Sequence, residues 1–251
     1  MRPPLLTHLL GGAVLAGTLS SASVCAADHE ALLRPVNMPP SADLHYILKA
    51  RQKGLSLGGE AQVTWRAGEG KYSLVTETRA QIFGKILDSR SEGLIDHYGI
   101  APLQFVEKRF HKEATTATFD RAAKTMNFSA GKETYPLLGG EQDRSSAQWQ
   151  LAALARAQPD KFIPGSEWHM FVAGRKEAQA WSFKVVKREK IVTGIGEVEA
   201  VLLSKAPPPG DKDQTVDLWL APAYDWYPVQ LRYSDEDGEF IEQTVDKISK
   251  K

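Results

Sequence analysis

The sequence lacks residues that several classes of protein require. It contains one cysteine, Cys25, which excludes an internal disulfide and a cysteine-rich zinc site. It also lacks an excess of charge of either sign, because 31 lysines and arginines balance 31 aspartates and glutamates. A general nucleic-acid-binding protein usually carries a basic excess, so we expect no nucleic-acid partner. With 42% hydrophobic residues among 251, the chain has the composition of a folded protein with a sizeable core.

Long apolar runs are absent except at the amino terminus. There Arg2 precedes an uncharged and mostly apolar stretch over residues 9–19, and Val24-Cys25-Ala26 follows with side chains suited to a cleavage site. This three-part pattern predicts a secretory signal peptide over residues 1–26, and an uncleaved membrane anchor is the alternative. The stretch is too short to cross a bilayer comfortably, so we expect no membrane span in the mature chain. We expect a periplasmic protein if the source is Gram-negative.

Cys25 also lacks the surroundings of a lipidated cysteine. A bacterial lipoprotein carries a small residue directly before that cysteine and usually a leucine three places before it. Here those positions hold Val24 and Ala22. We therefore expect no lipid anchor, and we expect Cys25 to leave with the signal peptide. The mature chain would then contain no cysteine, which suits an oxidising compartment.

After a lead-in over residues 27–40, which three prolines mark as flexible or extended, the body of the chain alternates apolar and polar residues. Period-two alternation with one apolar face is typical of half-buried antiparallel strands. It recurs over residues 61–65, 72–82, 103–107, 115–119, 126–128, 168–172, 181–185, 198–202, 216–220, 229–233 and 240–244. The spacing predicts one all-β domain over residues 41–251. We expect a curved antiparallel sheet or a partly closed barrel of about ten to twelve strands.

One segment, residues 145–158, breaks the alternation and predicts a helix. It is rich in Ala, Leu and Gln, and Pro159 ends it. Ser145 with Gln148 matches a capping box, and Asp143 is an alternative cap.

The faces of this helix differ. Ala147, Leu151 and Leu154 form one apolar stripe. Trp149 lies off the stripe, so we expect it to pack on a second surface.

Catalytic and metal-binding motifs are missing. The sequence contains no G-x-S-x-G elbow, no S-x-x-K set, no H-E-x-x-H pair and no phosphate-binding glycine loop. We therefore predict no metal and no cofactor. The six tryptophans, which include Trp149 and Trp219, fit either a plain core or an apolar ligand cavity.

Several short words, taken in order, resemble a known family. They are Ser91-Glu92-Gly93-Leu94, residues 99–105, Arg109, Thr118-Phe119-Asp120, residues 142–146, residues 219–222 and Pro228-Val229. Together they resemble the bacterial exported proteins of domain-of-unknown-function family 3108, over roughly residues 42–247. The resemblance implies a secreted, mostly antiparallel β protein and no particular activity. The ending is also loosely similar to the half-barrels of lipoprotein carriers.

These words supply the candidate site. Asp143 and Ser146 suit the start of the helix, and Asp120 suits a turn after a strand. Arg109 is expected to be an inward charge paired with Asp120 or Asp143, since an unpaired buried charge is costly. The candidate residues are Arg109, Asp120, Asp143, Ser146, Trp149 and Trp219.

The function expected from these features is non-enzymatic. We expect the protein to bind an apolar small molecule, a lipid or another envelope-derived ligand in a concave sheet. The alternative is a structural partner of another envelope protein, and a hydrolase is a third reading.

Overall fold

The computed structural model describes residues 30–206 and 214–251, so the predicted signal peptide lies outside the described residues. The described part consists of antiparallel strands, one α-helix and two short 3₁₀ helices. The strands are β1 Ala42–Gln52, β2 Leu55–Gly68, β3 Lys71–Ala80, β4 Gly84–Asp96, β5 Gly99–Arg109, β6 Thr115–Asp120, β7 Thr125–Phe128, β8 Tyr135–Pro136, β9 Gln142–Asp143, β10 Glu167–Ala173, β11 Ala178–Thr193, β12 Gly196–Lys205, β13 Thr215–Ala221, β14 Tyr227–Ser234 and β15 Phe240–Lys250. The helices are α1 Ser146–Ala157, η1 Pro159–Lys161 and η2 Pro222–Tyr224.

All of these strands belong to one open sheet. Its 15 strands follow the order β8-β7-β6-β5-β4-β3-β2-β1-β15-β14-β13-β12-β11-β10-β9. Neighbours are antiparallel, except that β9 and β10 are parallel. The first and last strands, β1 and β15, pair with each other in the middle. The prediction of a curved, unclosed antiparallel sheet with one helix is confirmed, with more strands than expected.

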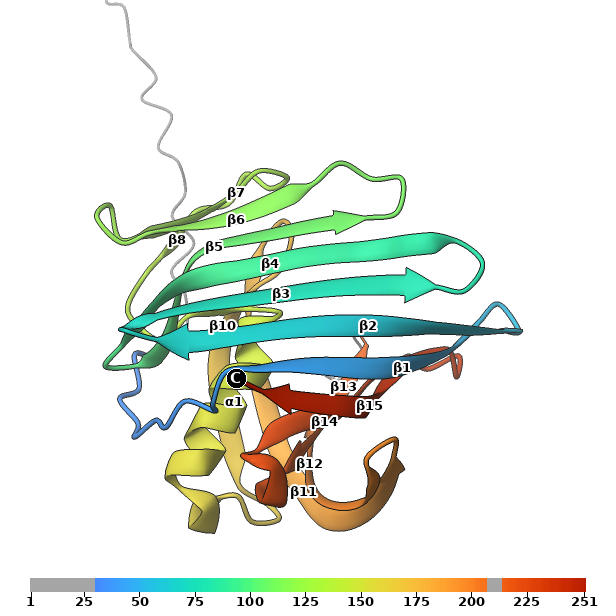
Figure 1. Ribbon diagram of the computed structural model, residues 1–251. Coiled ribbons are helices and arrows are strands. Elements are labelled where there is room, and N and C mark those ends of the chain that lie inside the picture. Colours follow the sequence, from blue (N-terminus) through green and yellow to red (C-terminus); the bar gives the residue numbers. More distant parts are fainter. Residues whose placement is uncertain (1–29, 207–213) are drawn as a thin grey trace, which may run out of the picture.

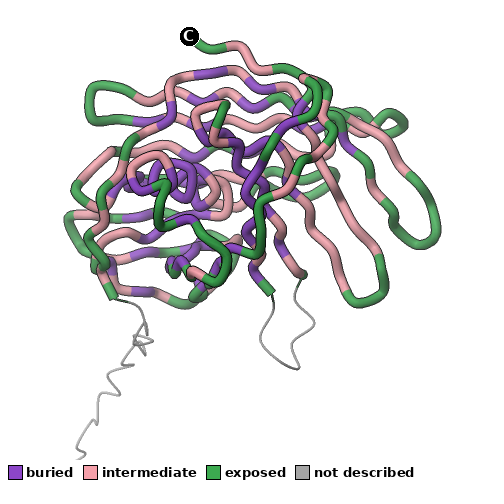
Figure 2. Tube along the Cα trace, turned by 90° about the horizontal axis from the view of Figure 1, so that it is seen from below, coloured by how far each residue is buried: buried purple, intermediate pink, exposed green. Residues whose placement is uncertain are grey.

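The sheet curls around the helix. In Figure 1, the strands from β1 to β8 stack on one side of α1, and β10 to β14 pass behind and beside it. Figure 2 shows that buried stretches gather along the strands and the helix, whereas the hairpin ends are exposed. The helix therefore lies inside the concave face.

Both faces of α1 are covered, as the sequence predicts. Ala147, Leu151 and Leu154 pack into the cluster formed by β10 to β14. Trp149 points to the other half, where its ring stacks on Trp65 with the centroids 4.5 Å apart. The helix thus joins the two halves of the sheet through opposite faces.

The start of the helix corrects one expectation. Ser145 makes no side-chain capping bond, so the capping box with Gln148 is wrong. The Asp143 carboxylate accepts hydrogen bonds from the backbone N–H groups of Ser145, at 2.8 Å, and Ser146, at 2.9 Å. The alternative cap at Asp143 is therefore the one that forms.

The two edges of the sheet meet along a seam of side chains. Strands β8 and β9 end the sheet on opposite sides, yet only residues 137–141 separate them in the chain. Tyr135 of β8 contacts Phe171 of β10 edge to face, with the ring centroids 5.5 Å apart. At Gly131, an added Cβ would lie 1.8 Å from the carbonyl oxygen of Lys176. Aromatic packing and close backbone approach therefore close the molecule where the β-ladder stops.

The end of the lead-in forms a strap, residues 34–40, across the helix. The N–H of Asn37 donates to the carbonyl of Ala153 at 3.0 Å. The indole of Trp65 donates to the carbonyl of Pro39 at 3.0 Å, and the hydroxyl of Tyr227 donates to that of Pro40 at 2.8 Å. The carbonyls of Pro39 and Pro40 thus bind the core, and the N–H of Asn37 binds the helix.

Candidate functional site

The inner face of strands β1 to β5 is arranged in rows of register partners. The row nearest the helix is Phe105, Ser91, Leu74, Trp65 and Ala42. The helix covers this row, because Trp149 stacks on Trp65 and Asp143 accepts a hydrogen bond from the hydroxyl of Ser91. No residue of this row lines the cavity described next.

The next two rows face a cavity of about 330 Å³. One row contains Glu107, Ser89, Thr76 and Val63, and the other contains Arg109, Leu87, Thr78 and Tyr46. All eight of these side chains line the cavity. The helix thus fills one end of the concave face and leaves the other end hollow.

The remaining walls come from distant segments. Strands β14 and β15 contribute Pro228, Leu231, Tyr233, Ile241 and Gln243, and the start of the helix contributes Arg144, Ser145, Gln148 and Trp149. The strand walls of the cavity therefore combine apolar side chains with Ser, Thr and charged ones, and the end next to the helix N-terminus is polar.

A second hollow, of about 430 Å³, lies over strands β1 to β3 and is not a comparable site. It is lined by residues of these strands and the turn that follows, including Gly58, Gly59, Glu60 and Arg79. No helix or second sheet wall faces it, so a ligand there would stay largely in contact with water. Because small-molecule sites usually enclose most of a ligand, the concave cavity is the better candidate.

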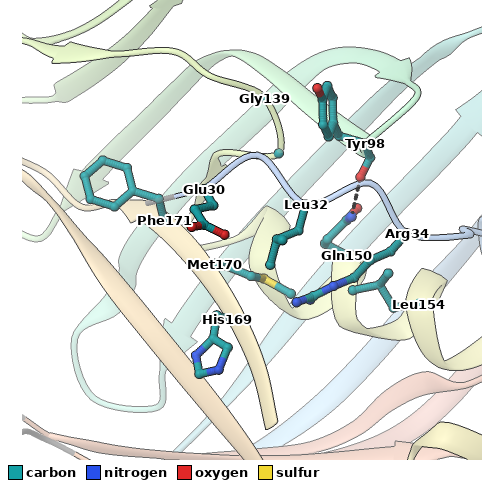
Figure 3. Close-up of a pocket in the computed structure, with 11 residues that line it drawn as sticks. Glu30, Leu32, Arg34, Tyr98, Gly139, Gln150, Leu154, His169, Met170 and Phe171 are labelled. Carbon is teal, nitrogen blue, oxygen red and sulfur yellow. Dashed lines mark hydrogen bonds between the residues drawn. The ribbon is translucent and has the colours of Figure 1, made fainter. Parts of the chain in front are cut away.

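A much smaller crevice, shown in Figure 3, lies between the beginning of the described chain and the helix. Its volume is about 40 Å³, so it can hold roughly one or two water molecules. Figure 3 shows Leu32 and Arg34 above the helix, and Gln150 donating a hydrogen bond to the Tyr98 carbonyl. The oxygen of the same amide accepts a bond from the N–H of Ile100 at 2.9 Å. The crevice is thus part of the contact that holds the β4–β5 hairpin on the helix.

Two of the sequence-predicted residues line the cavity. Arg109 reaches it from the end of β5, and Trp149 reaches it from the helix. The expected pairing of Arg109 with Asp120 or Asp143 is wrong. Its ion pair is with Glu107, two residues earlier on the same face of β5, at 3.7 Å between Nε and Oε1.

Asp143 and Ser146 are fully buried beside the cavity rather than in it. Burial raises the pKa of Asp143 to about 6, while hydrogen bonds from Ser91, Ser146 and Ser145 act in the opposite direction. The Ser91 hydroxyl is in turn 2.7 Å from the Tyr72 hydroxyl. This network fixes the helix to strands β3 and β4.

Asp120 and Trp219 lie elsewhere. Asp120 accepts hydrogen bonds from the N–H groups of Ala122 at 3.0 Å and Ala123 at 2.9 Å, which order the β6–β7 turn. Trp219 points away from the cluster that contains Leu218 and Leu220, and its indole donates to Glu189 at 3.0 Å. The structure therefore does not bring the six candidate residues together.

Sequence reasoning missed the other polar residues of the cavity. Glu107 and Tyr233 carry no motif, and only the fold brings them to the same cavity. Arg144 stands inside the word formed by residues 142–146, between two residues with structural roles. This position was the only feature of the sequence that pointed to Arg144 as a candidate site residue. Among the described residues, no group of three or more His, Cys, Asp or Glu side chains is placed to hold a metal ion.

The fold and the cavity define a class: an all-β protein whose open sheet curls around one helix and keeps a hollow beside it. A family model places the chain more narrowly. Residues 43–246 match the family described as "Protein of unknown function (DUF3108)", and the chain belongs to that family. No curated protein matches the chain.

The solved structures that match the chain are distant. One is described as an exported protein with a YmcC-like fold from Bacteroides fragilis, with 10% identity and a TM-score of 0.35 over 88% of this chain and 100% of that one. A DUF1329 family protein from Desulfovibrio piger has 7% identity and a TM-score of 0.30, over 84% of this chain and 86% of that one. A domain described as an outer membrane lipoprotein-sorting protein, from Vibrio parahaemolyticus, has 10% identity and a TM-score of 0.28 with the same coverages. The family assignment thus rests on the sequence match.

Proposed function

We propose that this protein is a non-enzymatic periplasmic binding protein that holds an apolar ligand in its concave cavity. The observation that carries the proposal is the hollow left beside the helix. Its volume of about 330 Å³ lies within the range usual for small-molecule sites.

The composition of the walls supports an apolar ligand. Leu48, Val63, Leu87, Leu231 and Ile241 line the cavity from strands β1, β2, β4, β14 and β15. A well-packed core would fill such a space, because interiors are close to crystal density. An apolar hollow maintained beside a filled core favours an occupant that the chain itself does not supply.

The polar lining supports binding rather than catalysis. Ser89 and Ser145 line the cavity, but no histidine does so within the described residues. Glu107, the one lining carboxylate in the described part of the chain, is already ion-paired with Arg109 and Arg175. A serine nucleophile needs an adjacent base, and these neighbours do not provide one.

The cavity can be tested by filling it. Thr78, 6% exposed, points inward from β3, whereas Val75 on the same strand points outward. We expect Thr78→Phe to abolish binding of the apolar fluorescent probe N-phenyl-1-naphthylamine, while Val75→Phe leaves it unchanged. Thermal melts of both variants check that each is folded. A folded Thr78→Phe variant that binds the probe like the parent would overturn the proposal.

The natural occupant can be sought directly. Protein purified from its own cell envelope is analysed by native mass spectrometry and by organic extraction. We expect a co-purifying apolar molecule that Thr78→Phe lacks and Val75→Phe retains.

The localisation follows from the signal pattern at residues 1–26. No helix among the described residues has the length and apolar character needed to cross a membrane. Cell fractionation and the intact mass of the purified protein test the proposal. We expect a periplasmic product that begins near Ala27, and a cytoplasmic product of full mass would contradict it.

A further inference from the structure

One end of the cavity carries more positive than negative charge. The Glu107 carboxylate, whose side chain is 11% exposed, lies 3.7 Å from Nε of Arg109 and 3.6 Å from Nε of Arg175. Arg175 comes from the turn between β10 and β11, across the seam from β5. One carboxylate therefore neutralises only one of these two guanidinium groups.

A third guanidinium, that of Arg144, joins them. Arg144 lines the cavity immediately before the helix, and its Cδ lies 4.0 Å from where a Cβ would stand on Gly174, next to Arg175. Within the described ranges, Arg144 has no carboxylate within 4.0 Å, since none of the ion pairs there includes it. Burial lowers the pKa of Arg175, and the charges of Arg109 and Arg144 lower it further against the effect of Glu107. The charges of Arg109 and Arg144 thus both act on Arg175.

Such an arrangement is unfavourable by itself. Like charges that are partly removed from water repel each other more than they would in solvent. Water screens part of this repulsion, because the Arg109 side chain is 44% exposed and that of Arg175 is 30% exposed. Among the described residues, Glu107 is the one carboxylate that lines the cavity. A ligand that brings a negative group would offset the unbalanced guanidinium charge.

We propose that the ligand is an amphiphile whose oxyanion head group, a carboxylate or a phosphate, binds Arg109 and Arg144 while its apolar chain lies along Leu48, Val63 and Leu231. This inference rests on the proposed binding function and names the ligand class. The planar guanidinium fork binds both oxyanions through paired hydrogen bonds, which makes arginine better suited than lysine to this task. Arg175 does not line the cavity, but its ion pair with Glu107 keeps its positive charge close to Arg109.

The inference is tested with probes that share a chain and differ in the head group. Dodecanoate, dodecyl phosphate and dodecanol compete with N-phenyl-1-naphthylamine for the cavity. We expect both anions to displace the probe at concentrations about tenfold or more below that of the alcohol. Equal displacement by dodecanol would contradict the proposed oxyanion head group but would still agree with an apolar ligand in the cavity. Failure of the naphthylamine itself to bind would instead remove the proposed function.

A free anion is the other source of the same chemistry. Inorganic phosphate is titrated by calorimetry against the parent protein. If inorganic phosphate binds as tightly as dodecyl phosphate, the proposal of an amphiphilic ligand is wrong, because the apolar chain then adds nothing to the affinity.

Matched variants locate the head group. We expect Arg109→Gln and Arg144→Gln each to weaken dodecyl phosphate about tenfold more than they weaken N-phenyl-1-naphthylamine, which has no anionic head group. The control is Arg90→Gln on β4, where an exposed arginine pairs with Glu92 outside the cavity. Unchanged affinity for dodecyl phosphate in both cavity variants, with melts like the parent's, would contradict the assignment.

Discussion

Asp143 is a carboxylate placed where water does not reach. Its Oδ1 caps the helix, and its other oxygen accepts the hydroxyl of Ser91. These bonds stabilise the ionised form, yet burial outweighs them and raises the pKa to about 6. The contribution of Asp143 to the free energy of unfolding therefore depends on pH.

The sign of that dependence follows from the direction of the shift. The folded protein binds the proton of Asp143 more tightly than the unfolded chain does, so the free energy of unfolding falls as pH rises from about 4 to about 6. We expect Asp143→Asn to remove this fall, which amounts to at most roughly 3 kcal/mol. Urea unfolding of both proteins between pH 4 and pH 7 measures it. Parallel profiles would show that the pKa is not raised.

Trp149 couples the helix to the sheet and also forms part of the cavity wall. It is 1% exposed, stacks on Trp65 and meets Tyr227 edge to face. We expect Trp149→Ala to lower the free energy of unfolding by about 3–5 kcal/mol, because it leaves a large void beside the hollow. Denaturant unfolding gives the value. The comparison is Trp219→Phe in the same core cluster, for which a much smaller loss is expected because an aromatic ring remains.

At the residue scale, the sequence supported local roles better than pairings. The cap at Asp143 and the turn at Asp120 depend on neighbours within three positions, so both could be predicted. The partner of Arg109 could not be predicted from motif words, because Glu107 belongs to none of them. Arg175 joins that pair only because the sheet curls and brings β10 and β11 back to β5.

At the scale of elements, the residues on the inner face of a strand determine how clearly apolar and polar residues alternate in its sequence. Strand β4 places Ser89 and Ser91 inward, where they face the cavity and Asp143, so its apolar alternation is weak. This is the physical reason that the run over residues 84–96 escaped the strand prediction. Strand β1, which was also missed, does alternate, with Leu44, Tyr46 and Leu48 buried. Its signal was available in the sequence.

The seam depends on two turns that approach without side chains between them. We expect Gly131→Ala to lower the free energy of unfolding by about 2 kcal/mol, because the new Cβ would press on the Lys176 carbonyl and separate the turns. Gly68→Ala is the matched control, since nothing lies within 4 Å of a Cβ there. Thermal unfolding of the two variants provides the comparison. Equal melting temperatures would mean that the turns can move apart freely.

At the scale of the whole molecule, the β-ladder is continuous from β8 through the β1–β15 pair to β9, and it stops at the seam. Side-chain packing alone is a weaker barrier to local opening than a ladder flanked by strands on both sides. We expect amides of residues 125–136 to exchange with solvent faster than those of residues 42–50 and 243–250. Hydrogen–deuterium exchange by mass spectrometry tests this. Equal protection would mean that the molecule opens only as a unit.

The pairing of the first and last strands also has a consequence for how the chain reaches its folded state. Strand β1 begins at Ala42 and its partner β15 ends at Lys250, so nearly the whole chain must be present before the sheet is continuous. Contacts this far apart in sequence make folding slow. If the chain crosses a membrane from its amino end, β1 waits as an uncovered edge that carries Leu44, Tyr46 and Leu48, and such edges attract other chains. A chain that stops before β15 would keep that edge permanently and become prone to aggregation.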